Sequence, residues 1–431
     1  MQNKATISKI LIITISLFTV GSLSISYYFL FSKANNENLN YIPENAIVKV
    51  RINGKSLAGK TIKNICFEKP ESKLLTQLDT LIHQTLRTDL KNTGIDYLSE
   101  IGAFITENDG KYNYFLVLNV DDKNEFNAYF SNLTNVNFTI NQDGTVGIVE
   151  LGFDVFKKDN LNEFLKKESS FKFKESDFTN DITIEGKGFD LFSKNVFFKL
   201  NCNFYADKIS IDGNIQNTFN SFNNKFSLIK NGLHISINEK NTLQKVSKLI
   251  QAFNPSFPEL NHFEINYRGV SLTEGGNPYY AEPNFDLLIG FKNNIQKDSL
   301  LNFVNNYKDF GFSYSNNKLS MGKSVYNLKV LKDTYLFISK NSKAVTQKSD
   351  DDIFEINGSP ELLTKIKAPE YITSFFEMMS PYAASKSYLT SIKNINLKVT
   401  TNKFKTEITF KKNKNSFQEL LKAFLIVKGI Q

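Results

Sequence analysis

An apolar strand pattern followed by helical spacing recurs along the chain. Each copy begins with an apolar run typical of a β-strand, passes through a short stretch of Asn, Asp or Lys, and ends with the spacing of an amphipathic helix. Four full copies span residues 115–133, 234–253, 285–307 and 404–424, and a shorter one spans 46–65. The sequence therefore predicts a fold built from strand-to-helix units.

The helical parts of these units have apolar residues three or four positions apart. Polar residues before each helix are expected to cap it, because an Asn, Asp or Ser oxygen can accept from the first free amides. A further helix is predicted over residues 73–87. The spaced apolar positions are Phe126, Tyr129, Phe130 and Leu133; Leu243, Val246, Ile250 and Phe253; and Phe417, Leu420, Leu421 and Phe424.

Turn residues between alternating runs predict β-hairpins. Asn108-Asp109-Gly110 and Gln142-Asp143-Gly144 each separate two such runs, and Asp-Gly is a strong hairpin signal. Residues 182–215 and 312–340 have the same alternation. The predicted fold class is therefore α+β, with mostly antiparallel sheets that are each covered on one face by the helices.

The spacing of the units suggests an internal duplication. Val120 and Phe291, at the ends of two strand runs, are 171 positions apart, and Ile237 and Phe410 are 173 positions apart. A repeat of this length would produce two related halves. We place the halves at residues 43–258 and 259–431.

The N-terminus contains the longest apolar stretch. Residues 10–32 carry no charge over 23 positions and are bracketed by Lys9 and Lys33. Because about 20 helical residues cross the hydrocarbon core, we interpret this stretch as a transmembrane anchor. The alternative is a cleaved signal peptide ending near Ser32.

The charges around the stretch indicate its orientation. Lys4, Lys9 and the α-amine crowd the first nine residues, whereas Lys33 is the one cation between the anchor and Lys49. This asymmetry favours a cytoplasmic tail at residues 1–9, a linker at 33–42 and an extracytoplasmic or periplasmic remainder. The lipid bilayer is thus an expected partner through residues 10–32.

Composition excludes several classes of protein. The chain is 41% hydrophobic with 39 Phe and 18 Tyr, which excludes a disordered chain. Its 2 Cys and 3 His exclude a disulfide scaffold and a zinc finger. We predict no metal, no cofactor and no catalytic residue. Cys66 and Cys202 are expected either to form a disulfide or to remain two separate thiols.

Cations are concentrated near the start of the large region. Residues 45–65 hold Lys49, Arg51, Lys55, Lys60 and Lys63 and no acid, in a chain with 52 Lys and Arg, 44 Asp and Glu and a net charge of +8. Such a segment could face anionic lipid or an acidic polymer. A nucleic-acid site is not indicated, because cations and aromatics do not interleave as in a known module.

The strand within this segment has a simple alternation. Lys49 and Arg51 alternate with Val48, Val50 and Ile52, which predicts a solvent-exposed polar face. Lys49 and Arg51 are therefore candidates for a partner-binding surface. A Gly/Pro loop that presents Tyr279 and Tyr280 is a second candidate, because such loops often carry recognition residues. The apolar segment 369–388 is expected to be a buried helix.

One segment matches a catalytic motif. Gly54, Gly59, Lys60 and Thr61 fit the phosphate-loop pattern, in which backbone amides and a lysine hold phosphates and a Thr holds Mg²⁺. However, such a loop follows a buried apolar strand, and the strand here carries Lys49 and Arg51. The other strand-to-helix copies lack a glycine loop. A capped helix over residues 56–65 is the preferred interpretation. His83, His234 and His262 are expected to be half-buried packing residues.

The opening of the large region resembles a known group of proteins. Tyr41-Ile42-Pro43-Glu44-Asn45-Ala46, followed by Ile52-Asn53-Gly54-Lys55-Ser56-Leu57, is similar to the start of exported, membrane- or lipid-anchored Bacteroidetes envelope proteins of unknown function. Residues 332–340 and 394–424 resemble later parts of that group. The resemblance implies an envelope location and no known activity.

These patterns predict a membrane-anchored extracytoplasmic protein that binds an envelope protein partner or acts as a scaffold, rather than an enzyme. Two alternatives stay open. One is a phosphate-loop nucleotide hydrolase, and the other is a carrier of lipid or another hydrophobic ligand, which would need an apolar cavity between sheet and helices.

Overall fold

The structure is a computed structural model. The chain forms two compact units, Met1–Gly186 and Lys187–Gln431. The predicted anchor at 10–32, the predicted helix at 73–87, Tyr279, Tyr280 and the segment 369–388 lie outside the described residues. Within the described part, none of the helices is both long and apolar enough to cross a bilayer. The described residues are 36–67, 93–108, 111–133, 136–151, 158–165, 171–187, 197–216, 221–222, 225–253, 255, 257–272, 281–295, 312–321, 324–340, 345–347, 352–364, 366–367, 389–411, 416 and 419.

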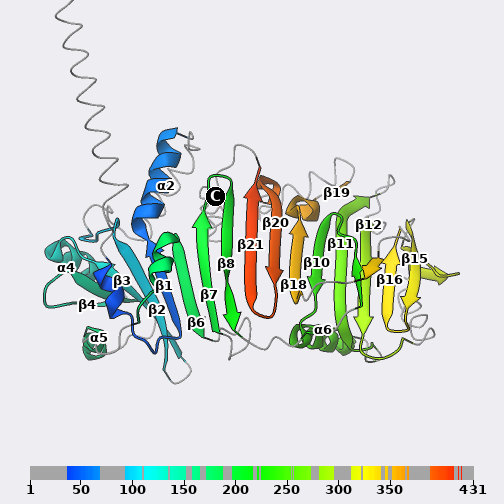
Figure 1. Cartoon of the computed structure of the whole chain (residues 1–431), viewed down its shortest axis with the longest axis horizontal. Helices are drawn as coiled ribbons and strands as arrows, with labels where there is room; N and C mark the ends of the chain where they lie inside the picture. The colour runs from blue at the N-terminus through cyan, green and yellow to red at the C-terminus, as the bar shows by residue number, and fades with distance from the viewer. Residues whose placement is uncertain are drawn as a thin grey trace, which may run out of the picture. The chain divides into compact units, whose positions relative to one another are not determined.

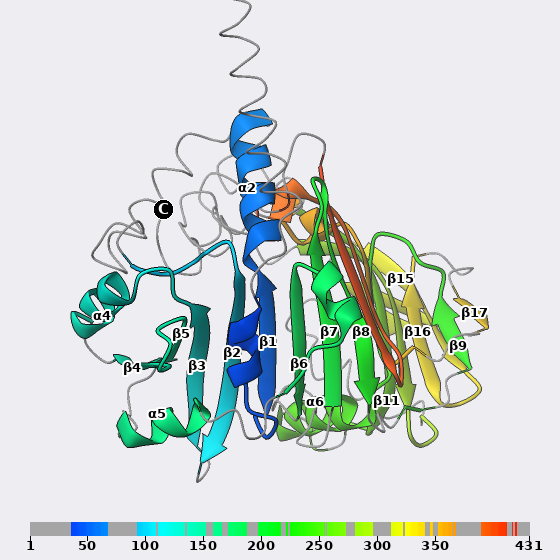
Figure 2. The same cartoon turned by 60° about the vertical axis from the view of Figure 1, so that its left-hand side comes forward.

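The first unit is built on an antiparallel sheet (Figures 1 and 2). Its β2–β3 and β4–β5 hairpins form where the Asp-Gly signals predict them: Asn108 pairs with Lys111, and Ile140 pairs with Gly147. Gly144 has a φ of 75°, which a glycine adopts without strain. In spatial order the strands are β6 (Ile182–Lys187), β1 (Val48–Asn53), β2 (Glu100–Asn108), β3 (Lys111–Asn119), β5 (Val146–Leu151) and β4 (Val136–Ile140).

Helix α4 (Lys123–Ser131) confirms one of the predicted strand-to-helix units. Its N-cap Asp122 accepts from the amides of Asn124 and Glu125. Phe126, Tyr129 and Phe130, spaced as the sequence predicts, are its buried residues. The other helical elements of this unit are η1 (Glu37–Tyr41), α2 (Gly54–Phe67), α5 (Lys158–Phe164) and η3 (Glu175–Thr179).

Helical elements pack on both faces of this sheet, so the prediction of a single covered face is wrong here. Phe104 and Phe115 point to one face and pack with residues of η1 and α5. Leu116 and Val149, one position out of phase, point to the other face and pack with α4. Two cores therefore form, because alternate residues along each strand are apolar on both sides.

The second unit contains a larger sheet, in which twelve described strands follow one another antiparallel (Figure 1). In spatial order they are β7 (Phe197–Phe204), β8 (Lys208–Gln216), β21 (Lys403–Phe410), β20 (Ile392–Val399), β18 (Phe354–Gly358), β10 (Leu233–Ile237), β11 (Leu260–Leu272), β12 (Ala281–Phe291), β16 (Tyr335–Ser339), β15 (Ser324–Leu331), β14 (Lys318–Met321) and β13 (Phe312–Ser315).

Shorter elements complete this unit. Strand β19 (Ile366–Lys367) pairs in parallel with β11, and β9 (Phe226–Leu228) pairs with β17 (Val345–Gln347) in a separate two-stranded sheet. Helix α6 (Lys240–Phe253) confirms a second predicted unit, since Leu243, Val246 and Ile250 pack in one hydrophobic cluster with β11, β12 and β16. A 3₁₀ helix, η6, spans Pro360–Thr364.

The coarse prediction of mostly antiparallel sheets is confirmed by the pairings of both units. The boundary between the compact units falls after Gly186. Two related halves at 43–258 and 259–431 stay a prediction.

Candidate functional site

The segment that matches the phosphate-loop motif is helical. Gly54 is the first residue of α2, and the Asn53 side-chain oxygen accepts from the amide of Ser56 over 2.8 Å, as an N-cap does. A Cβ on Gly54 would lie 2.3 Å from the carbonyl oxygen of Tyr97, so only glycine fits where the strand enters the helix. Gly59 is exposed on the helix surface, and Thr61 continues the helix. A phosphate loop instead leaves its amides open toward the ligand.

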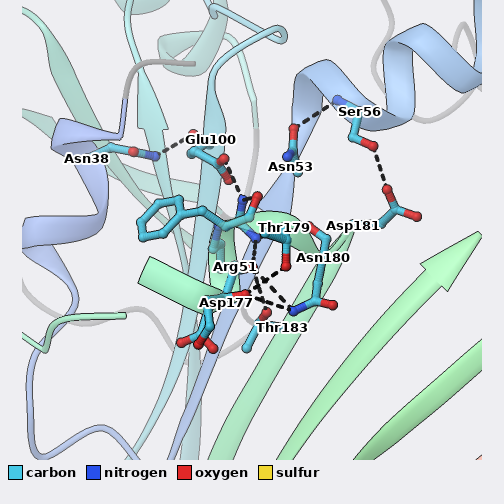
Figure 3. A network of polar contacts seen from close by, with 12 residues as sticks. Asn38, Arg51, Asn53, Ser56, Glu100, Asp177, Thr179, Asn180, Asp181 and Thr183 are labelled. Atoms are coloured by element: carbon cyan, nitrogen blue, oxygen red, sulfur yellow. Dashed lines mark hydrogen bonds and ion pairs between the residues drawn. The ribbon is translucent and has the colours of Figure 1, made fainter. Parts of the chain in front are cut away.

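Lys60 is bound to a carboxylate of its own chain. Its Nζ forms an ion pair with Oδ2 of Asp181. The Ser56 hydroxyl donates to Asp181 Oδ1 over 2.5 Å (Figure 3). Asp181 is buried, and its carbonyl oxygen accepts from the amide of Asn53 over 2.8 Å. A phosphate would have to compete with this carboxylate for Lys60. The arrangement favours the capped-helix interpretation.

Arg51 lies at the centre of a buried network, so the prediction that it is exposed is wrong. Its side chain is 0% exposed, and Nη2 donates to Glu100 Oε1 over 2.6 Å. Nη1 donates to the carbonyl oxygens of Asp177 over 2.6 Å and Asn180 over 3.0 Å. The guanidinium also lies 4.5 Å from the centroid of the Phe178 ring. Arg51 therefore ties the η3 segment to the sheet (Figure 3).

Lys49 is buried as well, so the prediction that it is exposed is also wrong. Its Nζ lies 4.4 Å from the centroid of the Phe171 ring, a cation–π contact. The physical reason is that residues 171–181 cover the face to which Lys49 and Arg51 point. Alternation along β1 separates the two faces but cannot tell which face a segment more than 100 positions away will cover.

Burial also changes the acid of this network. Desolvation raises the pKa of Glu100 above its ordinary value, although the charge and hydrogen bond of Arg51 act in the opposite direction. The backbone oxygen of Glu100 accepts from the side-chain amides of Asn38 and Asn119. The network thus joins η1, β1, β2, β3 and η3. Its contacts stabilise the first unit.

A second polar cluster lies in the other unit, on one face of β10 and β11. His234 and His262 are fully buried rather than half-buried as predicted. Nδ1 of His234 is 2.8 Å from Asn266 Oδ1. Because the Asn266 side-chain nitrogen donates to the carbonyl oxygen of Ile229, its oxygen faces the histidine, and Nδ1 is the donor.

Glu264 holds strand β9 on this polar face. The Ser227 hydroxyl donates to Oε1 over 2.7 Å, and the Leu228 amide donates to Oε2 over 2.5 Å. Burial opposes ionisation of Glu264, but the nearby His262, whose Nε2 lies 3.8 Å from Oε1, and the hydrogen bonds from Ser227 and Leu228 outweigh it, so its pKa is lowered. In a Ser–His pair the hydroxyl contacts a histidine that activates it, whereas the Ser227 hydroxyl contacts the Glu264 carboxylate. The cluster therefore has the arrangement of a structural bond between β9 and the sheet.

The remaining predicted residues are placed as follows. Cys202 lies on β7, while the Cys66 side chain is outside those described, so their pairing stays a prediction. Among the described residues, no three His, Cys, Asp or Glu side chains are grouped to hold a metal ion.

Sequence reasoning missed an exposed apolar cluster on the first unit. Tyr112, Tyr114 and Leu151 are 42%, 46% and 40% exposed. Tyr114 lies directly opposite Leu151 on β5 and opposite Ile105 on β2. The available signal was the Lys-Tyr-Asn-Tyr alternation after the Asp109-Gly110 turn, which puts both tyrosines on one face. We call Tyr112, Tyr114 and Leu151 the tyrosine cluster.

Comparisons with known proteins give no family. No family model and no curated protein matches the chain. Solved structures of TP0453 align with it: crystal form III has a TM-score of 0.21, is 11% identical and covers 73% of this chain and 96% of that chain. Crystal form IV has a TM-score of 0.20, is 12% identical and covers 74% and 96% of the two chains. This likeness is distant, and we infer nothing about function from it.

Proposed function

We propose that the chain is a single-pass membrane protein of the cell envelope that binds a protein partner. Residues 10–32 are the anchor, the N-terminus is cytoplasmic, and both described units lie on the extracytoplasmic side. The uncharged stretch and its flanking lysines support the anchor and its orientation. The resemblance of residues 41–57 to anchored envelope proteins agrees with this placement.

The tyrosine cluster is the observation that carries the binding proposal. Tyrosines are enriched at protein interfaces, because they bring a large apolar area and a polar tip at low entropic cost. Tyr114 and Leu151 form one row with Ile105 and Val136 across four neighbouring strands. In this row the exposed Tyr114 and Leu151 lie between the half-buried Ile105 and Val136, and an exposed apolar pair of this kind suits a protein surface.

Two measurements test this proposal. Protease should digest the region after residue 40 in cells whose outer membrane has been permeabilised and whose inner membrane is intact. Protection of this region under the same conditions would overturn the proposed orientation. After crosslinking in cells, the purified full chain should carry a crosslinked envelope protein. The double variant Tyr114→Ala with Leu151→Ala should no longer capture that protein. Tyr205→Ala is the matched control, since Tyr205 is an exposed tyrosine of the other unit. Equal capture by all variants would contradict the assignment of the surface.

A hydrophobic ligand is the second candidate, and one observation favours it. A single row of directly paired residues crosses ten strands of the second unit and is apolar except at Thr406. Most of its members are half-buried. The row is Cys202, Ile211, Thr406, Leu397, Ile356, Ile235, Ile265, Leu287, Ile338 and Leu328.

Mass spectrometry of lipids that co-purify with the full chain tests this second candidate. Ile356→Lys should reduce the bound lipid, whereas Asn396→Lys, on the opposite face of the same sheet, should not. Circular dichroism of both variants separates lost binding from lost folding. The phosphate-loop hydrolase is the least supported function, because Lys60 is paired with Asp181.

A further inference from the structure

We propose that His234 is a proton-controlled clasp in the second unit: uptake of one proton on its Nε2 joins strand β10 to strand β18 through Glu355. The proton comes from the solvent, the only bond formed is Nε2–H, and the net charge around His234 rises by one. This device goes beyond the proposed function, and it depends neither on the membrane anchor nor on a protein partner.

The hydrogen bond to Asn266 fixes which nitrogen of His234 carries the proton of the neutral ring. His234 is 1% exposed, and its Nδ1 lies 2.8 Å from Asn266 Oδ1. Asn266 uses its side-chain nitrogen to donate to the carbonyl oxygen of Ile229 over 2.9 Å, so its oxygen faces the imidazole. Nδ1 is therefore the donor, and the neutral ring has a bare lone pair on Nε2.

This lone pair faces a carboxylate. Nε2 of His234 lies 3.9 Å from Oε2 of Glu355. Nε2 is buried and has no hydrogen-bond partner in the part of the chain that the structure describes. Two buried acceptors that face each other without a donor between them are unfavourable. A proton on Nε2 converts this contact into a charge-assisted hydrogen bond after a movement of about 1 Å.

Glu355 also connects His234 to the solvent. In the register of β10 and β18, His234 lies directly opposite Asn357, two positions beyond Glu355. The other oxygen of Glu355, Oε1, binds Nζ of Lys230 over 2.5 Å. The Lys230 side chain is 43% exposed, whereas that of Glu355 is 7% exposed. A proton can therefore reach the buried Nε2 along the side of the sheet on which Lys230 meets water.

The other charged groups on the neighbouring strands have partners of their own. Strand β11 carries Glu264 and Arg268 two positions to either side of Asn266, and β20 carries Lys398 directly opposite Glu355. Among the charged groups described, Glu355 is thus the one placed to pair with Nε2. The partners are Asp286 for Arg268, Asp352 for Lys398, and Ser227, Leu228 and His262 for Glu264.

The clasp acts where the segment after β9 is attached to the sheet. The consecutive residues 228–230 are bound in turn by Glu264, Asn266 and Glu355. His234 lies between the last two of these groups, with Nδ1 on Asn266 and Nε2 facing Glu355. Its protonated form therefore ties β11, β10 and β18 together, while its neutral form ties only β11 and β10.

Nuclear magnetic resonance can observe the proton directly. The chain has three histidines, so labelling histidine with ¹⁵N in the full chain gives three imidazole spectra, and His234→Gln identifies the one sought. Nε2 of His234 should gain a proton as the pH is lowered from about 8 to about 5, the range in which histidine ordinarily titrates. An Nε2 that stays unprotonated over this range overturns the proposal. Glu355→Gln should move the uptake to lower pH, and an unchanged uptake overturns the role of Glu355.

Thermal melting measures the effect of the clasp on the fold. Glu355→Gln should lower the melting temperature more at about pH 5.5 than at about pH 8, and this difference should vanish in a His234→Gln background. Lys230→Gln is the matched control: it removes the other partner of Glu355 and should cost no more at the lower pH. An equal loss from Glu355→Gln at both pH values overturns the clasp. The resonance measurement on the native chain decides the proposal if a variant does not fold.

Discussion

Arg51 and Glu100 form an ion pair on neighbouring strands of the first unit, with 2.6 Å between Nη2 and Oε1 and side chains that are 0% and 3% exposed. Arg51 Nη1 also binds backbone oxygens of the η3 segment. The guanidinium thus joins the sheet to this segment, and its removal would leave the buried Glu100 carboxylate without its cation.

Arg51→Met should lower the free energy of unfolding by about 3–5 kcal/mol, because breaking a buried pair leaves an uncompensated charge. The double change Arg51→Met with Glu100→Leu should cost less, since the stranded carboxylate is removed as well. Chemical denaturation of the full chain in detergent measures both. A double variant that is no more stable than Arg51→Met would contradict this account.

Glu264 should give the second unit a measurable dependence on pH. Its pKa in the folded state is lowered, so its ionised form stabilises the fold at pH values above the ordinary 4.5, and this contribution is lost as the pH falls through the folded pKa. The stability difference between the native chain and Glu264→Gln should therefore shrink as the pH is lowered below 4.5. Thermal melting at a series of pH values measures it, and a constant difference would show that the carboxylate is not responsible.

Gly147 and Phe126 set a steric limit in the core between the first sheet and α4. A Cβ on Gly147 would lie 2.4 Å from Cζ of Phe126, which is itself buried. Gly147→Ala should destabilise the chain by about 1–3 kcal/mol, as overpacking does. Introducing Phe126→Leu as well should recover part of the loss. Gly59→Ala is the control: the site is open, and Ala is favoured in a helix by about 1 kcal/mol.

Variants of Lys60 and Asp181 distinguish the capped-helix interpretation from the phosphate-loop interpretation. Lys60→Ala should change stability by less than about 1 kcal/mol, because the lysine side chain is partly exposed. Asp181→Ala should cost more, about 1–3 kcal/mol, since it leaves Ser56 without its acceptor. Neither ATP nor ATP with Mg²⁺ should raise the melting temperature of the native chain. A rise that Lys60→Ala abolishes would support the nucleotide hydrolase instead.

Local chemistry in the sequence determined several elements of this protein. The Asp-Gly turns located the β2–β3 and β4–β5 hairpins, and the apolar spacing located α4 and α6. The Asp122 cap could be predicted because a cap depends on residues within one helical turn. The same short-range turn and alternation signals predicted that the sheets are mostly antiparallel.

Tertiary structure alone decided the order of the strands and the fate of the polar residues. Strand β8 pairs with β21, where Lys208 and Glu407 meet across 199 positions of sequence. Arg51 and Lys49 are buried because residues 171–181 cover their side of the sheet, whereas Tyr112, Tyr114 and Leu151 stay exposed. Alternation in a strand defines two faces, but only contacts between distant segments determine which face is removed from water.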